Sequence, residues 1–579
     1  MNVMVESFGL KPNQEEDATL AVLQAIEHCR GIGGATLTFA EGEYHFWPDK
    51  AVERQYYVSN HDQEKTRKIA FPLLGMTGFT LDGQGATFIM HGLTTPFVID
   101  GSSDIALKNF AIDYKRPTLS QGMVVHADAA GFAVSIPDDY PYAVRGGELI
   151  AIGEGWEEPV TGIIVMDPRT KASKFRSGDS LMWDGYKEGR VEAIGEGLVR
   201  WSGFTHFAPE RGDVLLLQAG HRDCPGIFIT DSRDVSIAFV DLHASAGMGV
   251  IAQKSENLRL SAFNVTPRPG SGRLFSASAD ACHFVNCKGF IEIENCLFEN
   301  QMDDPCNVHG IYAQIAERRG DELLCRLVHP QQRGVEVLGE GDRVRLIRRD
   351  SLLPFFETTV ASVRRINAEY MLVELEARLP ADIRGGDAIE NLSWTPNLHI
   401  HGCVAKANRA RGFLITTSGD VLFEDNFVCT PGSALKLSGD ANYWFESGAL
   451  RSVAIRNNVF EDCNYGYPFW GKGTIDIDPE IEKPESYEGY YHSGIVIENN
   501  LFRTFHPVLL SGHSVDGLSF RDNDIERTST YPKPNHLPYA VDLKACDNVE
   551  IDGNRVAGGV LTCRINGNEA AQPLVRAES

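Results

Sequence analysis

The feature that most constrains the fold is an internal repeat along the chain. In each copy, two apolar residues separated by one other residue are followed by Asn or Asp and then by another apolar residue. The unit recurs about ten times, from DIALKNFAI at Asp104 to NVEIDGNRV at Asn548. Three pairs of equivalent apolar positions are 23 residues apart: Val235 and Leu258, Leu398 and Val421, and Ile495 and Leu518. The step from Leu258 to Phe290 is 32 residues, which indicates a coil of 23 residues with a loop inserted.

A period of 23 with short strands and no helices between them predicts an all-β chain, a right-handed parallel β-helix. Each coil of such a solenoid buries its inward side chains only against the coils above and below it. Asparagine suits the bends because it tolerates left-handed backbone angles and can align its amide between coils. The competing fold of this period, the leucine-rich repeat, lacks support because its LxxLxLxxN frame is absent.

Other segments depart from the period and predict additional elements. Residues 13–30 predict an amphipathic helix with Leu20, Leu23, Ala25 and Ile26 on one face, which would cap the open end of the solenoid. Two stretches of alternating strands and polar turns predict small antiparallel barrels or sandwiches inserted between coils, which would shape a substrate cleft or mediate assembly. The expected domains are 1–114 (cap and first coils), 115–222 (first insertion), 223–310 (coils with the candidate catalytic aspartates), 311–395 (second insertion) and 396–579 (C-terminal coils).

The charge balance limits the partners. With 54 Lys and Arg against 79 Asp and Glu, the net charge of −25 repels nucleic acid and anionic membranes, and it favours a neutral sugar over a polyanion such as pectin. No signal peptide and no apolar run of membrane-spanning length occur, so a complete chain is expected to be cytoplasmic, and an exported one would have lost a leader. The twelve cysteines form no CxxC pair and are expected to be mostly buried free thiols.

Two polar segments are candidates for chemistry. Asp280 lies in SADACHFVNC and Asp303–Asp304 in NQMDDPCNVHG, and Asp280 and Asp303 are 23 residues apart. One coil therefore separates them, and their backbones are expected to stack about 4.8 Å apart. Carboxylates this close acquire different pKa values, which supplies the general acid and general base of glycoside cleavage. A gap of about 6.5–9.5 Å would predict inversion and one of about 5–5.5 Å retention.

Further residues are candidates for substrate binding. Aromatic rings stack on the apolar face of a pyranose, and charged or amide side chains hydrogen-bond its hydroxyl groups. Several of these also have ordinary structural interpretations, such as aromatic packing over a coil edge or a surface arginine. No metal or cofactor is expected, because the histidines beside the aspartates lack zinc-site spacing. The candidates are Arg273, His283, Asn307, His309, Lys436, Asp440, Trp444, Glu446 and Trp470.

Six motifs in order resemble glycoside hydrolase family 110 over most of the chain. They are SNHDQ (59–63), FTLDGQGATFIMHG (79–92), GMGVIAQKSENL (247–258), SADACHFVNC, NQMDDPCNVHG and GDANYWFESG (439–448). The resemblance implies an exo-acting, inverting α-1,3-galactosidase that needs no metal and releases terminal galactose from structures such as the blood group B determinant. It also implies that Asp280 is the general acid and that Asp303 and Asp304 activate water.

Alternatives remain open at this stage. A polygalacturonase-like hydrolase also places an aspartate pair beside a third aspartate, but its basic motif for the uronate is not evident. A polysaccharide lyase would need a basic group opposite a uronate, for which only Lys436 is available. A non-catalytic β-helix, such as an adhesin or a tailspike-like stalk, would use the repeat for length alone. The sequence does not decide the oligomeric state, for which a homodimer is one option, or the choice between branched and linear α-galactosides.

Overall fold

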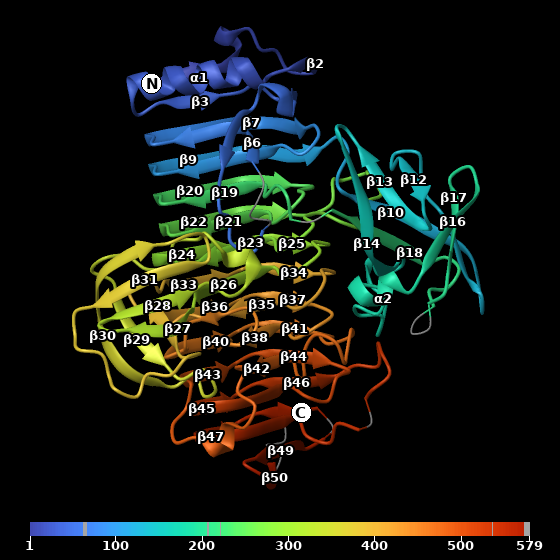
Figure 1. Cartoon of the computed structure of the whole chain (residues 1–579). Helices are drawn as coiled ribbons and strands as arrows, with labels where there is room; N and C mark the ends of the chain where they lie inside the picture. The colour runs from blue at the N-terminus through green and yellow to red at the C-terminus, as the bar shows by residue number, and fades with distance from the viewer. Residues whose placement is uncertain (62–65, 205–207, 221, 535, 558, 573–579) are drawn as a thin grey trace.

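The chain forms a column of stacked parallel coils from which two small β domains project (Figure 1). The computed structural model describes residues 1–61, 66–204, 208–220, 222–534, 536–557 and 559–572. The N-terminal helix lies at one end of the column and the last strands lie at the other (Figure 1). The predicted parallel β-helix with two inserted antiparallel domains is therefore confirmed.

The N-terminal helix is shorter than predicted. Helix α1 (Thr19–Ile32) begins six residues after the expected start at residue 13. The preceding residues instead form strand β2 (Gln14–Asp17), which pairs with β4 (Gly42–Phe46) and extends the first coil. Leu20, expected on the buried face, is 49% exposed, whereas Val22 is buried. The residue at which the helix begins thus determines which side chains lie on its buried face.

Strand pairing confirms most of the predicted period. The three pairs of positions 23 residues apart are direct partners on neighbouring coils. The predicted step from Leu258 to Phe290 is wrong by one residue, because Leu258 pairs with Ile291 after a register shift between β22 (Glu256–Val265) and β24 (Lys288–Glu294). Accordingly Phe290 is 45% exposed and Ile291 is fully buried.

At one bend of the coils, two consecutive residues have different structural roles. The first adopts the left-handed conformation, as Asp425, Asn457, Asn499 and Asp522 do. The second is an asparagine, buried in every coil but the last, whose side-chain carbonyl accepts hydrogen bonds from the backbone and amide of the previous coil, for example Asn458 Oδ1 from Asn426 N at 3.0 Å. This continuous ladder satisfies backbone groups that the bend would otherwise leave buried and unpaired. Its members are Asn426, Asn458, Asn500, Asn523 and Asn554.

The inward side chains of all coils form one continuous hydrophobic core. All twelve cysteines are free and eleven of them are buried, which confirms their prediction as buried thiols. Burial raises the pKa of the Cys287 thiol to about 12, so that this thiol stays protonated and behaves as a small apolar side chain.

The two inserted domains have different architectures. The first is a nine-stranded antiparallel sheet that runs from β10 (Leu119–Asp128) to β18 (Val214–Ala219) in sequence and includes a short helix, α2 (Trp183–Lys187). The second is a closed barrel of six strands. Its strands are β27 (Ala313–Arg319), β28 (Glu322–Arg326), β29 (Arg343–Ile347), β30 (Pro354–Arg365), β31 (Tyr370–Leu375) and β32 (Ala388–Asn391).

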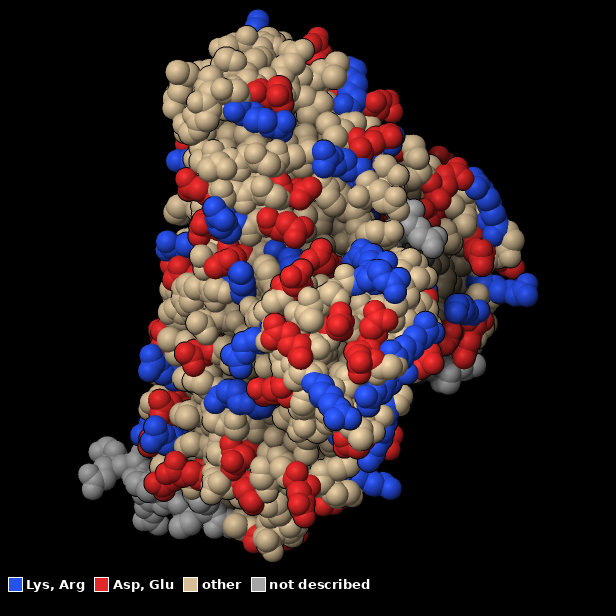
Figure 2. Space-filling model, turned by 60° about the vertical axis from the view of Figure 1, so that its left-hand side comes forward, with Lys and Arg blue, Asp and Glu red and all other residues tan. Residues whose placement is uncertain are grey.

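Charged side chains are distributed over the surface rather than gathered by sign. On the face shown in Figure 2, Lys and Arg alternate with Asp and Glu, and many lie next to one another. A broad basic surface of the kind that binds nucleic acid is not visible on that face. Across the described residues, the helices are too short or too polar to cross a bilayer.

Candidate active site

The candidate catalytic residues lie immediately before three neighbouring strands. Asp280 precedes β23 (Cys282–Val285), Asp303 and Asp304 precede β26 (Cys306–Ile311), and Arg411 precedes β35 (Phe413–Ile415). Cys282 pairs with Cys306, and Ala281 N donates to Asp304 O at 2.9 Å. The local step is therefore 24 residues, so Asp304 is the register neighbour of Asp280. The prediction that Asp303 would stack on Asp280 is wrong in register, because the coil is one residue longer than the basic period.

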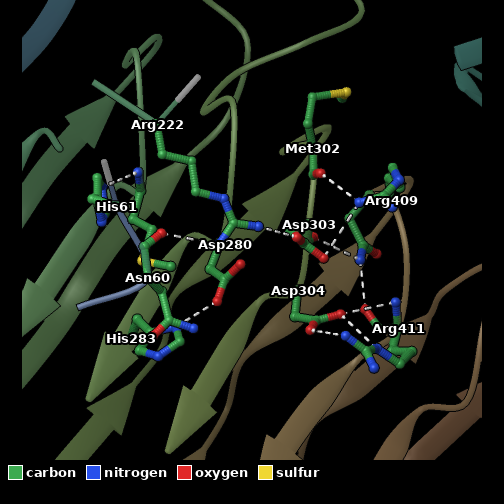
Figure 3. A network of polar contacts seen from close by, with 12 residues as sticks. Asn60, His61, Arg222, Asp280, His283, Met302, Asp303, Asp304, Arg409 and Arg411 are labelled. Carbon is green, nitrogen blue, oxygen red and sulfur yellow. Dashed lines mark hydrogen bonds and ion pairs between the residues drawn. The ribbon is translucent and has the colours of Figure 1, made fainter. Parts of the chain in front are cut away.

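Each carboxylate of the aspartate pair is held by an arginine from another segment. Asp303 Oδ2 accepts a hydrogen bond from Arg222 at 2.6 Å, and its Oδ1 lies 3.5 Å from Arg409 Nη1. Both oxygens of Asp304 accept hydrogen bonds from Arg411, which uses its backbone N–H and its guanidinium. Asp303 thus lies between two guanidinium groups and Asp304 faces a third (Figure 3). A loop conformation before β26 exposes both side chains to these partners.

Asp280 begins a chain of hydrogen bonds through two buried histidines. Its Oδ2 lies 2.6 Å from His283 Nδ1, His283 Nε2 lies 2.8 Å from His309 Nε2, and His309 Nδ1 lies 2.8 Å from the carbonyl oxygen of Gly310. A carbonyl oxygen can only accept, so His309 Nδ1 carries a hydrogen. In the arrangement in which His309 Nε2 accepts from His283 Nε2, His283 Nδ1 is left as an acceptor. The proton of the shortest bond then belongs to Asp280.

The electrostatics agree with a protonated Asp280. Burial, and then the negative charge of Asp303, raise the pKa of Asp280 to about 7, against the opposing charges of Arg222 and Arg411. Burial and the neighbouring His309 hold the pKa of His283 well below its usual range, so that ring is neutral. Burial also raises the pKa of Asp304 to about 7, although Arg411 opposes it. The carboxyl groups of Asp280 and Asp304 therefore both titrate around neutral pH.

These groups line one pocket with an empty volume of about 700 Å³, counted to its open mouth. Its walls carry six acidic side chains and three basic ones. The acidic ones are Asp280, Asp303, Asp304, Asp440, Glu446 and Glu480, and the basic ones are Arg222, Arg411 and Lys436.

Six predicted binding residues line this pocket: His283, Asn307, Lys436, Asp440, Trp444 and Glu446. Asn307 Oδ1 is buried and has no hydrogen-bond partner among the described residues, so it is an acceptor available to a ligand hydroxyl. Trp444 is 37% exposed, which leaves ring surface available for stacking. Asp440 instead accepts hydrogen bonds from the backbone of Asn442 and Tyr443, and therefore shapes the loop that carries Trp444.

Three predicted binding residues do not line the pocket. Arg273 lies in a different cleft, where it pairs with buried Asp113 at 2.6 Å, so its assignment to the catalytic cleft is wrong. Trp470 is 8% exposed, and its indole N–H donates to Asp179 at 3.1 Å. Its ring therefore serves packing rather than a sugar platform. His309 Nε2 lies 2.8 Å from His283 Nε2 and 3.5 Å from Glu446 Oε1, so His309 contacts the pocket through these two lining residues.

Sequence reasoning missed the arginines of the site. Arg411 is in register with Asp304, but 107 residues of sequence separate them because the closed barrel lies between their coils. Arg222 follows the first inserted domain and reaches Asp303 from outside the repeat. Asn60, in the motif SNHDQ, also lines the pocket, whereas Asp62 and Gln63 of that motif lie outside the described residues. The motif was the available signal for Asn60, but no periodicity could have indicated Arg222.

Both inserted domains border the site. Asp179 of the first domain holds Arg409 by two hydrogen bonds of 2.8 and 2.9 Å, and Arg409 in turn contacts Asp303. From the second domain, Gln332 donates to the carbonyl oxygen of Trp444 at 2.5 Å, and the ring of His329 packs against the indole at 4.3 Å. The insertions therefore position pocket residues, which agrees with the first role considered for them, that of shaping a substrate cleft.

The aspartate cluster could be considered for a metal ion, since one oxygen from each of Asp280, Asp303 and Asp304 lies within 4.8 Å of the others. Three guanidinium groups already contact Asp303 and Asp304, however, and offset the negative charge of these two carboxylates. A site without net negative charge has little attraction for a divalent cation, and the arginines occupy the oxygens that would bind it.

Among solved structures, the chain is similar to a family 28 exopolygalacturonase from Yersinia enterocolitica, with 13% identity, a TM-score of 0.39 and coverage of 96% of this chain and 78% of the other. It is also similar to the surface adhesin PfbA of Streptococcus pneumoniae, with 11% identity, a TM-score of 0.39 and coverage of 98% and 99%. The fold assignment depends on the strand pairing described above and not on these distant similarities.

Sequence comparisons are far more specific. The family models "GLAA-B beta-barrel domain I" and "GLAA-B beta-barrel domain II" match residues 120–215 and 322–389. The chain is 34% identical to α-1,3-galactosidase B of Bacteroides thetaiotaomicron over 96% of this chain and 91% of the relative. It is 34% identical to α-1,3-galactosidase A of Shewanella woodyi with the same coverage of each chain. This chain therefore belongs to the α-1,3-galactosidase family of glycoside hydrolases, family 110, which its motifs resemble.

Proposed function

We propose that this chain is an exo-acting, inverting α-1,3-galactosidase that releases terminal galactose from glycans, both of the blood group B type and with linear galactosyl-α-1,3-galactose ends. The observation that carries the proposal is the meeting of Asp280, Asp303 and Asp304 in one pocket, with Asp280 hydrogen-bonded so that it holds a proton. The names of the relatives supply the linkage and the sugar.

In the proposed reaction, Asp280 donates its proton to the glycosidic oxygen as the bond to the anomeric carbon breaks. A water molecule attacks that carbon from the opposite face and gives a proton to the aspartate pair. The products are galactose and the shortened glycan, and the two carboxyl groups exchange their protonation states through solvent before the next turnover.

Asp303 is proposed as the principal base. The Arg411 guanidinium and backbone N–H occupy both oxygens of Asp304, whose side chain is 3% exposed. Asp303 has a more accessible side chain, at 14%, and its Oδ1 has a single, longer arginine contact of 3.5 Å. It therefore has the freer oxygen for a water molecule, with Asp304 fixing the loop and the local charge.

The excess of acidic over basic side chains in the pocket supports a neutral substrate. Even with Asp280 protonated, the acidic groups outnumber the three basic ones and would repel the carboxylate of a uronic acid, which the polygalacturonase-like alternative requires. Lys436, the available base for a lyase, forms an ion pair with Asp478 at 2.9 Å. Stacking on Trp444 and a hydroxyl donor to Asn307 would suit a galactosyl ring.

Inversion rests on the family resemblance and on the paired carboxyl groups, not on their spacing. Between closest oxygens the three carboxyl groups lie within 4.8 Å, nearer the about 5–5.5 Å of retaining enzymes than the about 6.5–9.5 Å of inverting ones. A proton NMR time course on galactosyl-α-1,3-galactose tests this directly. β-Galactose should appear first; initial α-galactose would refute inversion, and no galactose at all would refute the activity.

A further inference from the structure

A second cluster of metal-binding side chains lies on the solenoid surface, away from the pocket. His399 and His401 are in strand β33 (Asn397–His401), separated by one residue, so both side chains project from the same face of the strand. Their rings stack with centroids 4.2 Å apart. Glu292 of β24 is the register partner of His399 on the preceding coil. Glu424 of β36 (Asp420–Glu424) is the register partner of His401 on the following coil.

The donor atoms of Glu292, His399 and His401 lie close together, and Glu424 joins this group through His399. His399 Nε2 lies 3.1 Å from Glu424 Oε1, and His401 Nε2 lies 3.5 Å from Glu292 Oε1. Nitrogen and oxygen ligands at about 2.0–2.1 Å from a tetrahedral zinc ion are about 3.3–3.4 Å from one another. The two observed separations bracket that value. One ligand atom from each of Glu292, His399 and His401 also lies within 4.8 Å of the others.

Two arginines hold the carboxylates in the orientation that a metal requires. Arg259 Nε contacts Glu292 Oε2 at 3.0 Å, and Arg456 Nε donates to Glu424 Oε2 at 2.8 Å. Each arginine therefore occupies the outer oxygen and leaves Oε1 facing an imidazole, as supporting hydrogen bonds do around metal ligands. Glu294 also pairs with Arg259, so three carboxylates and two guanidinium groups leave a net negative charge for a cation.

One donor in the cluster lacks a hydrogen-bond partner. His401 Nε2 is buried and makes no hydrogen bond to any of the described residues, although the residue itself lies near the surface. An unsatisfied buried polar atom is costly, and a bound ion would satisfy it. This observation adds to the spacing argument, because the carboxylates of Glu292 and Glu294 lie 3.5 and 3.9 Å from this nitrogen without forming a hydrogen bond to it.

We propose that Glu292, His399, His401 and Glu424 form a zinc site that ties three successive coils together. Two imidazoles and two carboxylates are a donor set that zinc accepts, whereas calcium and magnesium prefer oxygen ligands. The site is separate from the catalytic pocket, so its role is to stabilise the solenoid rather than to take part in turnover. The prediction that the chain has no metal site considered only the histidines beside the aspartates and not the His-Ile-His motif at 399–401.

The test is calorimetric titration of the full chain with zinc chloride after dialysis against a chelator. The wild type should bind one equivalent, and its thermal midpoint should rise with zinc. His401→Ala and Glu292→Gln should each weaken binding at least tenfold. Glu526→Gln, which alters a carboxylate paired with Arg503 outside this cluster, should bind as the wild type does. Calcium chloride should give no comparable binding.

A further variant separates this site from the aspartate cluster. Asp303→Asn should retain zinc binding, because it changes only the other group of carboxylates. X-ray absorption of the zinc-loaded protein should show nitrogen and oxygen ligands at about 2.0–2.1 Å. The proposal is overturned if the wild type binds no zinc, if His401→Ala binds zinc as well as the wild type, or if zinc binding is lost in Asp303→Asn alone.

Discussion

Replacing His309 by leucine should shift the pH dependence of turnover, because this residue determines which nitrogen of His283 faces Asp280. In the wild type, the chain of hydrogen bonds that ends at the Gly310 carbonyl leaves His283 Nδ1 as an acceptor. The general acid must be protonated to work, so kcat/KM should fall as the pH rises through the Asp280 pKa of about 7.

Leucine removes the acceptor for His283 Nε2–H, and the ring can then adopt the tautomer with hydrogen on Nδ1. That hydrogen would bond to the ionised form of Asp280 and favour it. A hydrogen bond to a charged group contributes about 1.5–3 kcal/mol, which at about 1.4 kcal/mol per unit lowers the pKa by about 1–2 units. At pH 7, kcat/KM should therefore fall about 5- to 50-fold, and the difference should narrow to about twofold or less at pH 5.

The assay is galactose release from galactosyl-α-1,3-galactose between pH 4.5 and 9, with circular dichroism to confirm folding. His309→Gln is the matched control, since its amide oxygen can accept from His283 and should keep the alkaline limb near that of the wild type. An alkaline limb in His309→Leu at the same pH as in the wild type would refute the tautomer argument. A wild-type rate that does not fall above pH 7 would refute Asp280 as the acid.

Three further outcomes are expected. Asp280→Asn should lower kcat on the disaccharide about 10²- to 10⁴-fold. Its effect on hydrolysis of 4-nitrophenyl α-galactoside should be far smaller, because that leaving group needs no proton. Equal losses on both substrates would contradict the role of Asp280 as general acid. Arg345→Ala in the closed barrel should lower the free energy of unfolding in urea by about 3–5 kcal/mol, because Glu390, 2.6 Å away and buried, loses its partner. Adding Glu390→Gln should restore part of that loss, and no recovery would argue against an unpaired charge. Asn458→Ala should lower the free energy of unfolding by about 1–3 kcal/mol, because the buried N–H of Asn426 is left without an acceptor; an unchanged urea midpoint would mean that the ladder adds nothing at this coil.

The repetitive part of the molecule was readable from sequence because its physical cause is local. Every coil presents the same alternation of buried and exposed side chains, so equivalent positions such as Val235 and Leu258 recur at the coil length. The same reasoning located the aspartates on neighbouring coils and the pocket residues around Trp444. It was wrong where a coil gains one residue, as between Asp280 and Asp304, because a single insertion shifts the register without disturbing the hydrophobic pattern.

By itself, the sequence therefore determined the solenoid, its capping helix, the two insertions and the aspartates, since these follow from periodicity and residue type. Only the tertiary structure decided what surrounds those aspartates. Arg222 and Arg411 belong to segments distant in sequence from Asp303 and Asp304, yet they contact these aspartates in the folded chain. Arg273, in contrast, lies in another cleft. Charge compensation acts through space at a few ångströms, and contacts between distant segments leave no periodic trace in the chain.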